Sequence, residues 1–141
     1  MKKIFYLILF ASTFSFSQDW KTDFTEAKTL AKENDKKIIL VFSGSDWCGP
    51  CIKMDKEIWK TNKFQEYSKS NYVMLKADFP RRKKNALTEE QLNHNKLLAE
   101  KYNRYGYFPF VVVLDKNANV IGETGYHKTT PEAFIKLINT Y

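Results

Sequence analysis

Two cysteines placed between an apolar run and an amphipathic segment are the feature that most constrains this fold. The run at 38–42 contains no polar residue, which is typical of a strand buried on both faces of a parallel sheet. Turn-forming residues follow it, and Cys51, Met54 and Ile58 then recur on one side of an expected helix. A strand joined directly to a helix is the repeating unit of an α/β fold, so Cys48 and Cys51 are expected at a strand–helix junction.

The rest of the chain alternates in the same way. Asp23, Thr88 and Thr130 precede helical patterns and are expected to be N-cap residues. We expect helices at 23–34, after Cys51, at 88–102 and at 130–141, and strands at 38–42, 72–77, 110–114 and 120–124. Strands that alternate with helices pair in parallel, while the two late strands form a hairpin. The sequence therefore predicts an α/β fold with a mixed sheet of about four strands and helices on both faces.

The spacing of Cys48 and Cys51 points to chemistry rather than to a structural staple, because so short a loop restricts the unfolded chain very little. Cys48 is expected in the first turn of its helix, where unpaired backbone N–H groups and the helix dipole favour a thiolate. The thiolate is the species that attacks disulfides. Cys51 lies one turn further along and can attack a mixed disulfide formed at Cys48. Pro50 has no N–H, which costs little in a first helical turn.

The string Trp-Cys-Gly-Pro-Cys at 47–51 resembles the thioredoxin active site residue for residue. The longer segment 43–54 is similar to exported bacterial thioredoxin-like proteins, and the order of elements resembles the thioredoxin fold from 23 to 141. The resemblance implies a thiol-disulfide oxidoreductase in which Cys48 is the nucleophile and Cys51 the resolving cysteine. It also implies that protein thiols and disulfides are the substrates, and that the redox-active Cys48–Cys51 disulfide takes the place of a cofactor.

A second match lies before the strand at 110–114. Thioredoxins carry a cis-proline at this point, packed against the active-site sulfurs, and Pro109 is the matching residue. The alternative for Pro109 is an ordinary trans proline at the start of a strand. By the same resemblance, Phe108 offers its backbone to a bound peptide, and Gly125-Tyr126 complete the groove. The expected substrate-binding residues are Trp47, Gly49, Pro50, Phe108, Pro109, Gly125 and Tyr126.

Two positions depart from the family pattern. Thioredoxins have a buried carboxylate six residues before the first cysteine, where it assists proton transfer to the second sulfur, but this chain has Phe42 there. Asp46 and Asp78 are the nearest substitutes, although Asp46 also fits a solvated loop or a helix start. Release of substrate by Cys51 is therefore expected to be slower or to need a higher pH. Phe108 is bulky where many relatives carry Ile, Thr or Val, which implies a narrower or more apolar substrate preference.

The segment Arg-Arg-Lys-Lys at 81–84 has no counterpart in a minimal thioredoxin. Such charge runs are usually solvated loops, and the alternative is a docking site for an acidic partner. The only two histidines, His94 and His127, lie in polar stretches and are expected to face solvent. Neither has metal-ligand spacing to the cysteines, and zinc needs more ligands than one such pair supplies, so no metal site is expected.

The first residues have the pattern of a secretory signal peptide. Lys2 and Lys3 precede an apolar run at 4–10, and small residues at Ser15 and Ser17 predict cleavage before Gln18. That run is too short for a membrane-spanning helix. We therefore expect a signal peptide at 1–17, a thioredoxin-like domain at 18–141, and a periplasmic or secreted location. The formal charge of +7 is spread along most of the chain and gives no indication of nucleic-acid binding.

The direction of electron flow follows less directly from the sequence. Cys-Gly-Pro-Cys favours a reductant, and an exported reductant must be recharged in oxidising surroundings, which implies a membrane electron donor. A disulfide oxidase or isomerase remains an alternative, as does a binding module that uses the same fold without catalysis. We expect a monomer.

Overall fold

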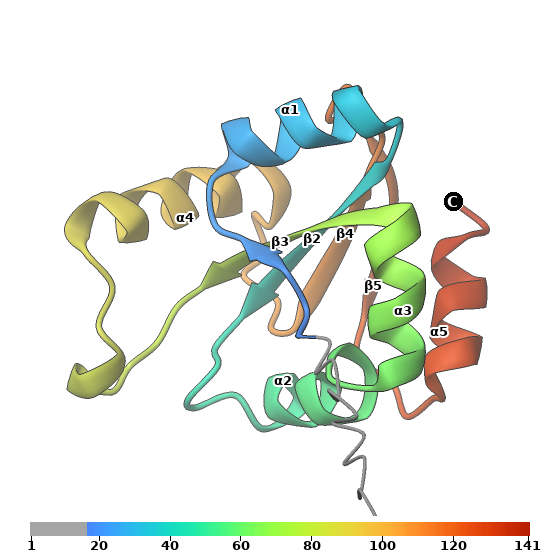
Figure 1. Cartoon of the computed structure of the whole chain (residues 1–141). Helices are drawn as coiled ribbons and strands as arrows, with labels where there is room; N and C mark the ends of the chain where they lie inside the picture. The colour runs from blue at the N-terminus through green and yellow to red at the C-terminus, as the bar shows by residue number, and fades with distance from the viewer. Residues whose placement is uncertain (1–16) are drawn as a thin grey trace, which may run out of the picture.

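The computed structural model describes residues 17–141, which form one five-stranded sheet covered by helices on both faces (Figure 1). The strands are β1 (Trp20–Lys21), β2 (Lys37–Ser43), β3 (Tyr72–Asp78), β4 (Phe110–Leu114) and β5 (Val120–Gly125), in the order β1-β3-β2-β4-β5. β2 pairs in parallel with β3, which also pairs in parallel with β1, while β4 is antiparallel to both β2 and β5. The mixed sheet is confirmed. β1 is an additional strand, too short at two residues to show any periodicity.

The helices follow the expected pattern with one addition. They are α1 (Phe24–Asn34), α2 (Gly49–Met54), the π-helical η1 (Asp55–Trp59), α3 (Asn62–Asn71), the 3₁₀ turn η2 (Lys83–Asn85), α4 (Glu89–Tyr102) and α5 (Pro131–Ile138). Asp23, Thr88 and Thr130 each accept a hydrogen bond from a backbone N–H three residues later, which confirms them as N-caps. The sequence did not predict α3, because only Phe64 and Ser68 of this largely polar segment are buried.

Alternate residues of the central strands supply two cores, one on each face of the sheet. Between the sheet and α2, η1, α3 and α5 lie Ile39, Val41, Met54, Ile58, Trp59, Phe64, Tyr72, Met74, Val111, Val113, Phe134, Ile135 and Ile138. Between the sheet and α1 and α4 lie Ala27, Ala31, Ile38, Leu40, Phe42, Val73, Leu75, Ala77, Leu98, Tyr102, Val112 and Leu114. The run at 38–42 feeds both cores, as expected for a strand buried on both faces.

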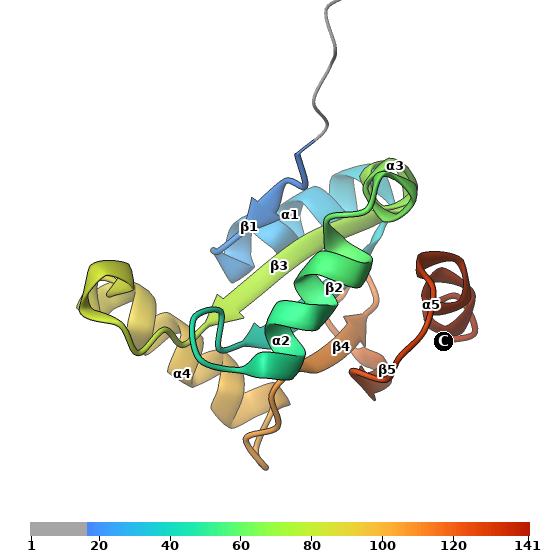
Figure 2. The same cartoon turned by 90° about the horizontal axis from the view of Figure 1, so that it is seen from below.

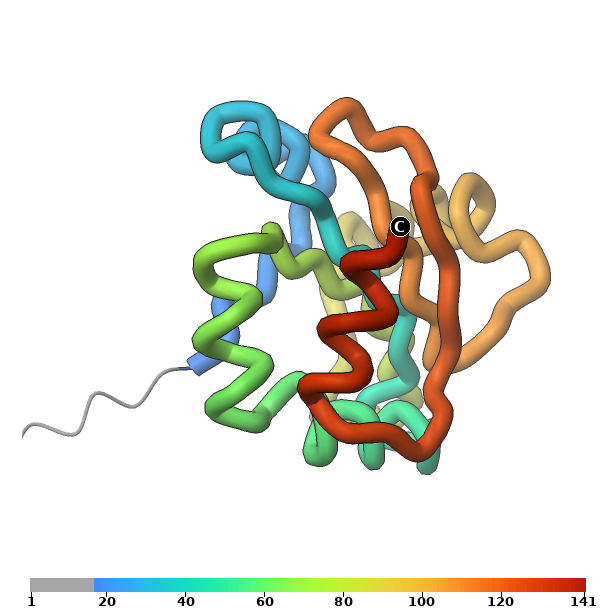
Figure 3. Tube along the Cα trace, turned by 90° about the vertical axis from the view of Figure 1, so that its right-hand side faces the viewer, coloured from blue at the N-terminus to red at the C-terminus, as the bar shows by residue number. Residues whose placement is uncertain are grey.

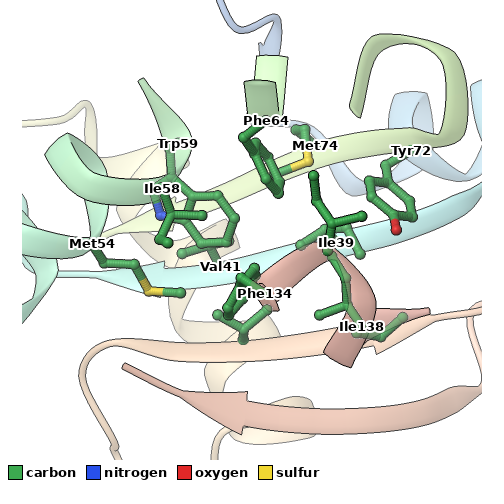
Figure 4. Close-up of a cluster of buried hydrophobic side chains, with 13 residues drawn as sticks. Ile39, Val41, Met54, Ile58, Trp59, Phe64, Tyr72, Met74, Phe134 and Ile138 are labelled. Atoms are coloured by element: carbon green, nitrogen blue, oxygen red, sulfur yellow. The ribbon is translucent and has the colours of Figure 1, made fainter. Parts of the chain in front are cut away.

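Aromatic rings join the helices of the first core to one another (Figure 4). The Trp59 ring centroid lies 4.8 Å from that of Phe64 and 5.3 Å from that of Phe134, so η1, α3 and α5 meet at these three side chains. α3 and α5 accordingly lie side by side on this face (Figure 3). The widened turn of η1 directs both Ile58 and Trp59 into the core.

Strand direction brings three connecting segments to one end of the sheet. β2 and β3 are parallel and end there, while the antiparallel β4 begins there. The loop before α2, the segment between β3 and α4, and the segment before β4 therefore meet at this end (Figure 2). In parallel sheets, binding sites form beyond the carboxyl ends of the strands. No helix within 17–141 is long and apolar enough to cross a membrane.

Candidate active site

The cysteine pair forms a disulfide at the start of α2. Cys48 is the N-cap residue, and the Cys51 backbone N–H donates to the Cys48 Sγ over 3.3 Å. The Cα atoms of the two residues are 5.2 Å apart. Cys48 retains only 5% exposure and Cys51 only 4%, so an attacking group can reach little of either sulfur. The strand–helix junction predicted for the pair is confirmed.

The chain before β4 lies against this disulfide end of the sheet. The Phe108–Pro109 peptide bond is cis, as the resemblance implied. Pro109 is buried and lines the same cavity as Cys51. Gly125 pairs with Phe110 across the sheet, and a Cβ atom at Gly125 would lie 3.6 Å from the Pro109 carbonyl oxygen. The structure thus brings Cys51, Pro109 and Gly125 to one place, although the chain separates them widely.

Trp47 is held in a fixed orientation beside the cysteines. Its Nε1–H donates to the Phe79 carbonyl over 2.7 Å, and its ring meets the Phe108 ring at a centroid distance of 5.5 Å. A Cβ atom at Gly44 would lie 2.3 Å from the Trp47 ring, so only glycine allows the indole to lie there. Phe108 also packs against Phe79 at 5.6 Å. Its bulk therefore completes an aromatic cluster, a role that the sequence alone did not indicate.

The remaining predicted groove residues differ in their surroundings. Gly49 and Pro50 are exposed next to the disulfide. Tyr126 packs against the first core, and its hydroxyl donates to Glu57 over 2.6 Å, which raises the pKa of Tyr126. The Tyr126 hydroxyl therefore links the segment after β5 to η1. That these residues contact substrate stays a prediction.

Hydrogen bonds already engage both aspartates considered as substitutes for the acid missing at Phe42. Phe42 is fully buried and stacks with Phe110 in the second core. Asp46 accepts hydrogen bonds from the backbone N–H groups of Arg81 and Arg82, over 2.9 and 3.0 Å, and from the Asn85 side chain over 2.8 Å. These donors, Arg81 foremost, hold the pKa of Asp46 below its ordinary value. Asp46 lies in the loop before α2, as one reading expected, and its carboxylate in addition binds the segment at 81–85, while the N-cap of α2 is Cys48 and not Asp46.

Asp78 also organises the loop. Its carboxylate accepts from the Ser45 backbone N–H over 2.9 Å and from the Ser45 hydroxyl over 2.5 Å. Both oxygens are therefore engaged with the segment that leads to the cysteines. Asp78 and Asp46 together fix the path of residues 45–47, which places Cys48 at the start of its helix.

A cavity of about 380 Å³ opens beside Cys51. Val41, Trp59 and Pro109 form its apolar wall. The charged side chains that line it are Lys60, Lys76, Arg82, Lys84, Asp46 and Asp55. Sequence reasoning did not single out Lys76, because one lysine in a strand carries no signal.

Lys76 is the least solvated cation of this cavity. Its ammonium lies 4.2 Å from the centroid of the Trp20 ring, and burial lowers its pKa. The carboxylates of Asp55 and Asp78 act in the opposite direction, whereas the nearby Lys60 ammonium adds to the lowering.

The two histidines differ from each other. His127 is exposed, as predicted. His94 is only half-exposed, and its Nε2 accepts the Phe24 backbone N–H over 3.2 Å, so the expectation of a solvent-facing side chain was wrong. The reason is that His94 of α4 lies against the first turn of α1, a contact between residues far apart in sequence. Residues 17–141 contain no cluster of three or more His, Cys, Asp or Glu side chains arranged to hold a metal ion.

Known proteins are similar to this chain in sequence and in fold. The model of a family described as thioredoxin-like matches residues 19–116. A disulfide bond reductase, DsbH of Chlamydia pneumoniae, is 31% identical over 121 residues, which cover 86% of this chain and 70% of that protein. Among solved structures, a DsbH oxidoreductase superposes with a TM-score of 0.80 at 29% identity, covering 88% of this chain and 83% of that one.

A thioredoxin from Thermus thermophilus shows the same fold at 17% identity, with a TM-score of 0.65 over 88% of this chain and 86% of that one. The family match spans most of the described residues, and the likeness to DsbH extends through the cysteine pair. The chain therefore belongs to the thioredoxin-like family and is a thiol-disulfide oxidoreductase of the CxxC type.

Proposed function

We propose that this protein reduces disulfides of other proteins outside the cytoplasm. The observation that carries the proposal is the N-cap position of Cys48, whose sulfur accepts the Cys51 N–H at the end of the sheet where Pro109 also lies. A sulfur that accepts a backbone hydrogen bond at a helix start is stabilised as a thiolate. The relative named as a disulfide bond reductase supports the direction of electron flow.

The reaction begins with both cysteines reduced. The Cys48 thiolate attacks one sulfur of the substrate disulfide, whose other sulfur leaves as a thiolate. Cys51 then loses its proton and attacks the Cys48 Sγ, which releases the second substrate sulfur as a thiolate. Two electrons have passed to the substrate, and the protein is left with the Cys48–Cys51 disulfide seen in this structure.

Substrate binding is assigned to the residues around the sulfurs. The backbone of Phe108, next to Pro109, is available to pair with an extended peptide, and Trp47, Gly49 and Pro50 form the neighbouring surface. Gly125 and Tyr126 lie on the far side of Pro109. Cys48 is the nucleophile in this scheme and Cys51 the resolving cysteine.

Export is the second part of the proposal. The predicted signal peptide lies at 1–17, almost entirely outside the described residues 17–141, and cleavage before Gln18 leaves the domain at 18–141. Electrons for each new cycle come from a membrane donor that reduces the Cys48–Cys51 disulfide, because the surroundings of an exported protein are oxidising. The active form is a monomer.

Equilibration of the purified protein in glutathione and dithiothreitol buffers tests this function. A reduction potential near the −270 mV typical of thioredoxin supports a reductase, whereas one near the −120 mV of strong periplasmic oxidants favours an oxidase or isomerase. Absence of any exchange contradicts catalysis and leaves a binding module. Cys48→Ser should abolish exchange, and Cys51→Ser should accumulate the mixed disulfide with substrate.

A further inference from the structure

The charged segment between β3 and α4 is built onto the active-site loop. We call residues 80–86 the basic arm. Asp46, two residues before Cys48, accepts the backbone N–H groups of Arg81 and Arg82. The Arg81 guanidinium lies over the Trp47 ring, 3.8 Å from its centroid, which adds a cation–π contact. The arm is therefore attached at several points to the loop that carries the nucleophile.

The anchoring leaves three cations of the arm facing outward. Arg82, Lys83 and Lys84 are exposed, and no ion pair found within 17–141 uses their side chains. Asp46 holds the arm through backbone hydrogen bonds, and the charge of Arg82 also acts on this carboxylate. The exposed side chains of Arg82, Lys83 and Lys84 still present positive charge to solvent.

Two of these cations line the cavity beside Cys51. Arg82 and Lys84 are joined there by Lys60 and Lys76, giving four cations against the carboxylates of Asp46 and Asp55. Asp55 pairs with Lys60 at 2.5 Å, so Lys76, Arg82 and Lys84 remain against the single carboxylate of Asp46. The rim formed by the arm therefore presents positive charge to any chain that lies against the Cys51 side of the disulfide.

We infer that the basic arm selects protein disulfides that have acidic residues close to the reactive cysteine. A substrate joined to Cys48 must pass close to Pro109 and Cys51. Arg82 and Lys84 line the same cavity as these two residues, so they lie close to the path of the substrate. Like charges placed together repel, so a segment rich in lysine or arginine is disfavoured there. This inference rests on the proposed function, because it concerns the substrates of the same cysteine pair.

Three disulfide peptides that differ only in flanking residues provide the test. One carries Asp and Glu beside the cysteine, one carries Lys, and one is neutral; each is reduced by the reduced protein at low ionic strength. We expect the second-order rate constant of this single turnover to be larger for the acidic peptide than for the basic one by about tenfold or more, the lower end of rate changes from charge steering. The difference should shrink at about 0.5 M salt, because screening shortens the range of these charges.

The double variant Arg82→Gln/Lys84→Gln should lose most of this preference and reduce the neutral peptide at the parent rate. Lys32→Gln/Lys136→Gln is the matched control, since it removes the same charge from the last turns of α1 and α5, at the opposite end of the sheet from α2 (Figure 1). The control variant should retain the preference for the acidic peptide. This result would show that the preference depends on the arm and not on the net charge of the protein.

Several outcomes overturn the inference while leaving the proposed function intact. Equal second-order rate constants for acidic and basic peptides do so, as does a preference that both double variants lose equally. Arm-dependent binding to vesicles of anionic lipid, without a peptide preference, assigns the arm to a membrane surface instead. Failure to reduce any of the three peptides overturns the proposed function itself and, with it, this inference.

Discussion

At the scale of single residues, Asp46 and Asp78 accept hydrogen bonds that hold together the loops around the cysteines. Asp46 binds the arm and Asp78 binds Ser45, while the position that holds an acid in thioredoxins is filled by the buried ring of Phe42. The cysteines could be identified from the sequence because they form a short contiguous motif with their neighbours, Trp-Cys-Gly-Pro-Cys. The role of Asp46 could not, because its donors lie 35 and more residues away and follow no periodic pattern.

The ring at Phe42 has a kinetic consequence. Without a buried carboxylate at this position, we expect the proton of the resolving thiol to pass to water or hydroxide, or to an acid already engaged in hydrogen bonds or an ion pair. The rate of reduction of a neutral disulfide peptide should therefore keep rising above pH 7, toward the range near 8.5 where ordinary thiols ionise. Stopped-flow measurement of single turnovers from pH 6 to 9 checks this, and a rate already maximal at neutral pH would contradict it.

The low pKa of Asp46 makes the attachment of the arm depend on pH. Since the carboxylate is favoured in the folded protein, its contribution is present above the unfolded value near 3.9 and is lost as pH falls through the lower folded value. The amide proton resonances of Arg81 and Arg82 should titrate with a midpoint below 3.9. Asp46→Asn should remove the titration; a midpoint at or above the unfolded value counts against the role of Asp46.

At the scale of elements, loops and helices meet through buried polar side chains. Asn95 of α4 is 1% exposed, and its side-chain N–H group donates to the Asp78 carbonyl at the end of β3 over 2.8 Å. The Gln91 side chain donates to the Asn95 Oδ1 over 2.9 Å. This contact fixes α4 to the strand that leads into the basic arm.

Replacing Asn95 with alanine should leave the Asp78 carbonyl without its donor. The expected loss is about 1–3 kcal/mol in the free energy of unfolding, the cost of an unsatisfied buried polar group. Urea denaturation followed by circular dichroism measures it. Asn93→Ala, at an exposed position of the same helix, is the control and should change the value by less than about 0.5 kcal/mol.

Some helices and strands could be predicted from the sequence and others could not. α1, α4 and α5 were predictable, because an N-cap residue precedes each and apolar side chains recur at helical spacing. α3 was not, since its buried face consists of Phe64 and Ser68 alone. β1 was missed because its two residues join the sheet only through pairing with Met74 and Leu75.

At the scale of the whole molecule, one face of the sheet depends on aromatic contacts among η1, α3 and α5. Phe134 is 1% exposed and touches both Trp59 and Phe64. Phe134→Ala should therefore lower the free energy of unfolding by about 3–5 kcal/mol, a large part of the stability of a domain this size. Urea titration tests it against Lys136→Ala, an exposed neighbour on α5. A loss below about 1 kcal/mol would show that the cluster is not a main source of stability.

The bond between Asp46 and the basic arm has a consequence for distance. One carboxylate, two residues from Cys48, accepts two consecutive backbone N–H groups of the arm, so the backbone of the arm is joined directly to the loop that carries the nucleophile. If the arm selects acidic substrates, it does so from a backbone position that is set relative to Cys48. Two substrates of equal charge would be told apart by how many residues separate their acidic group from their cysteine.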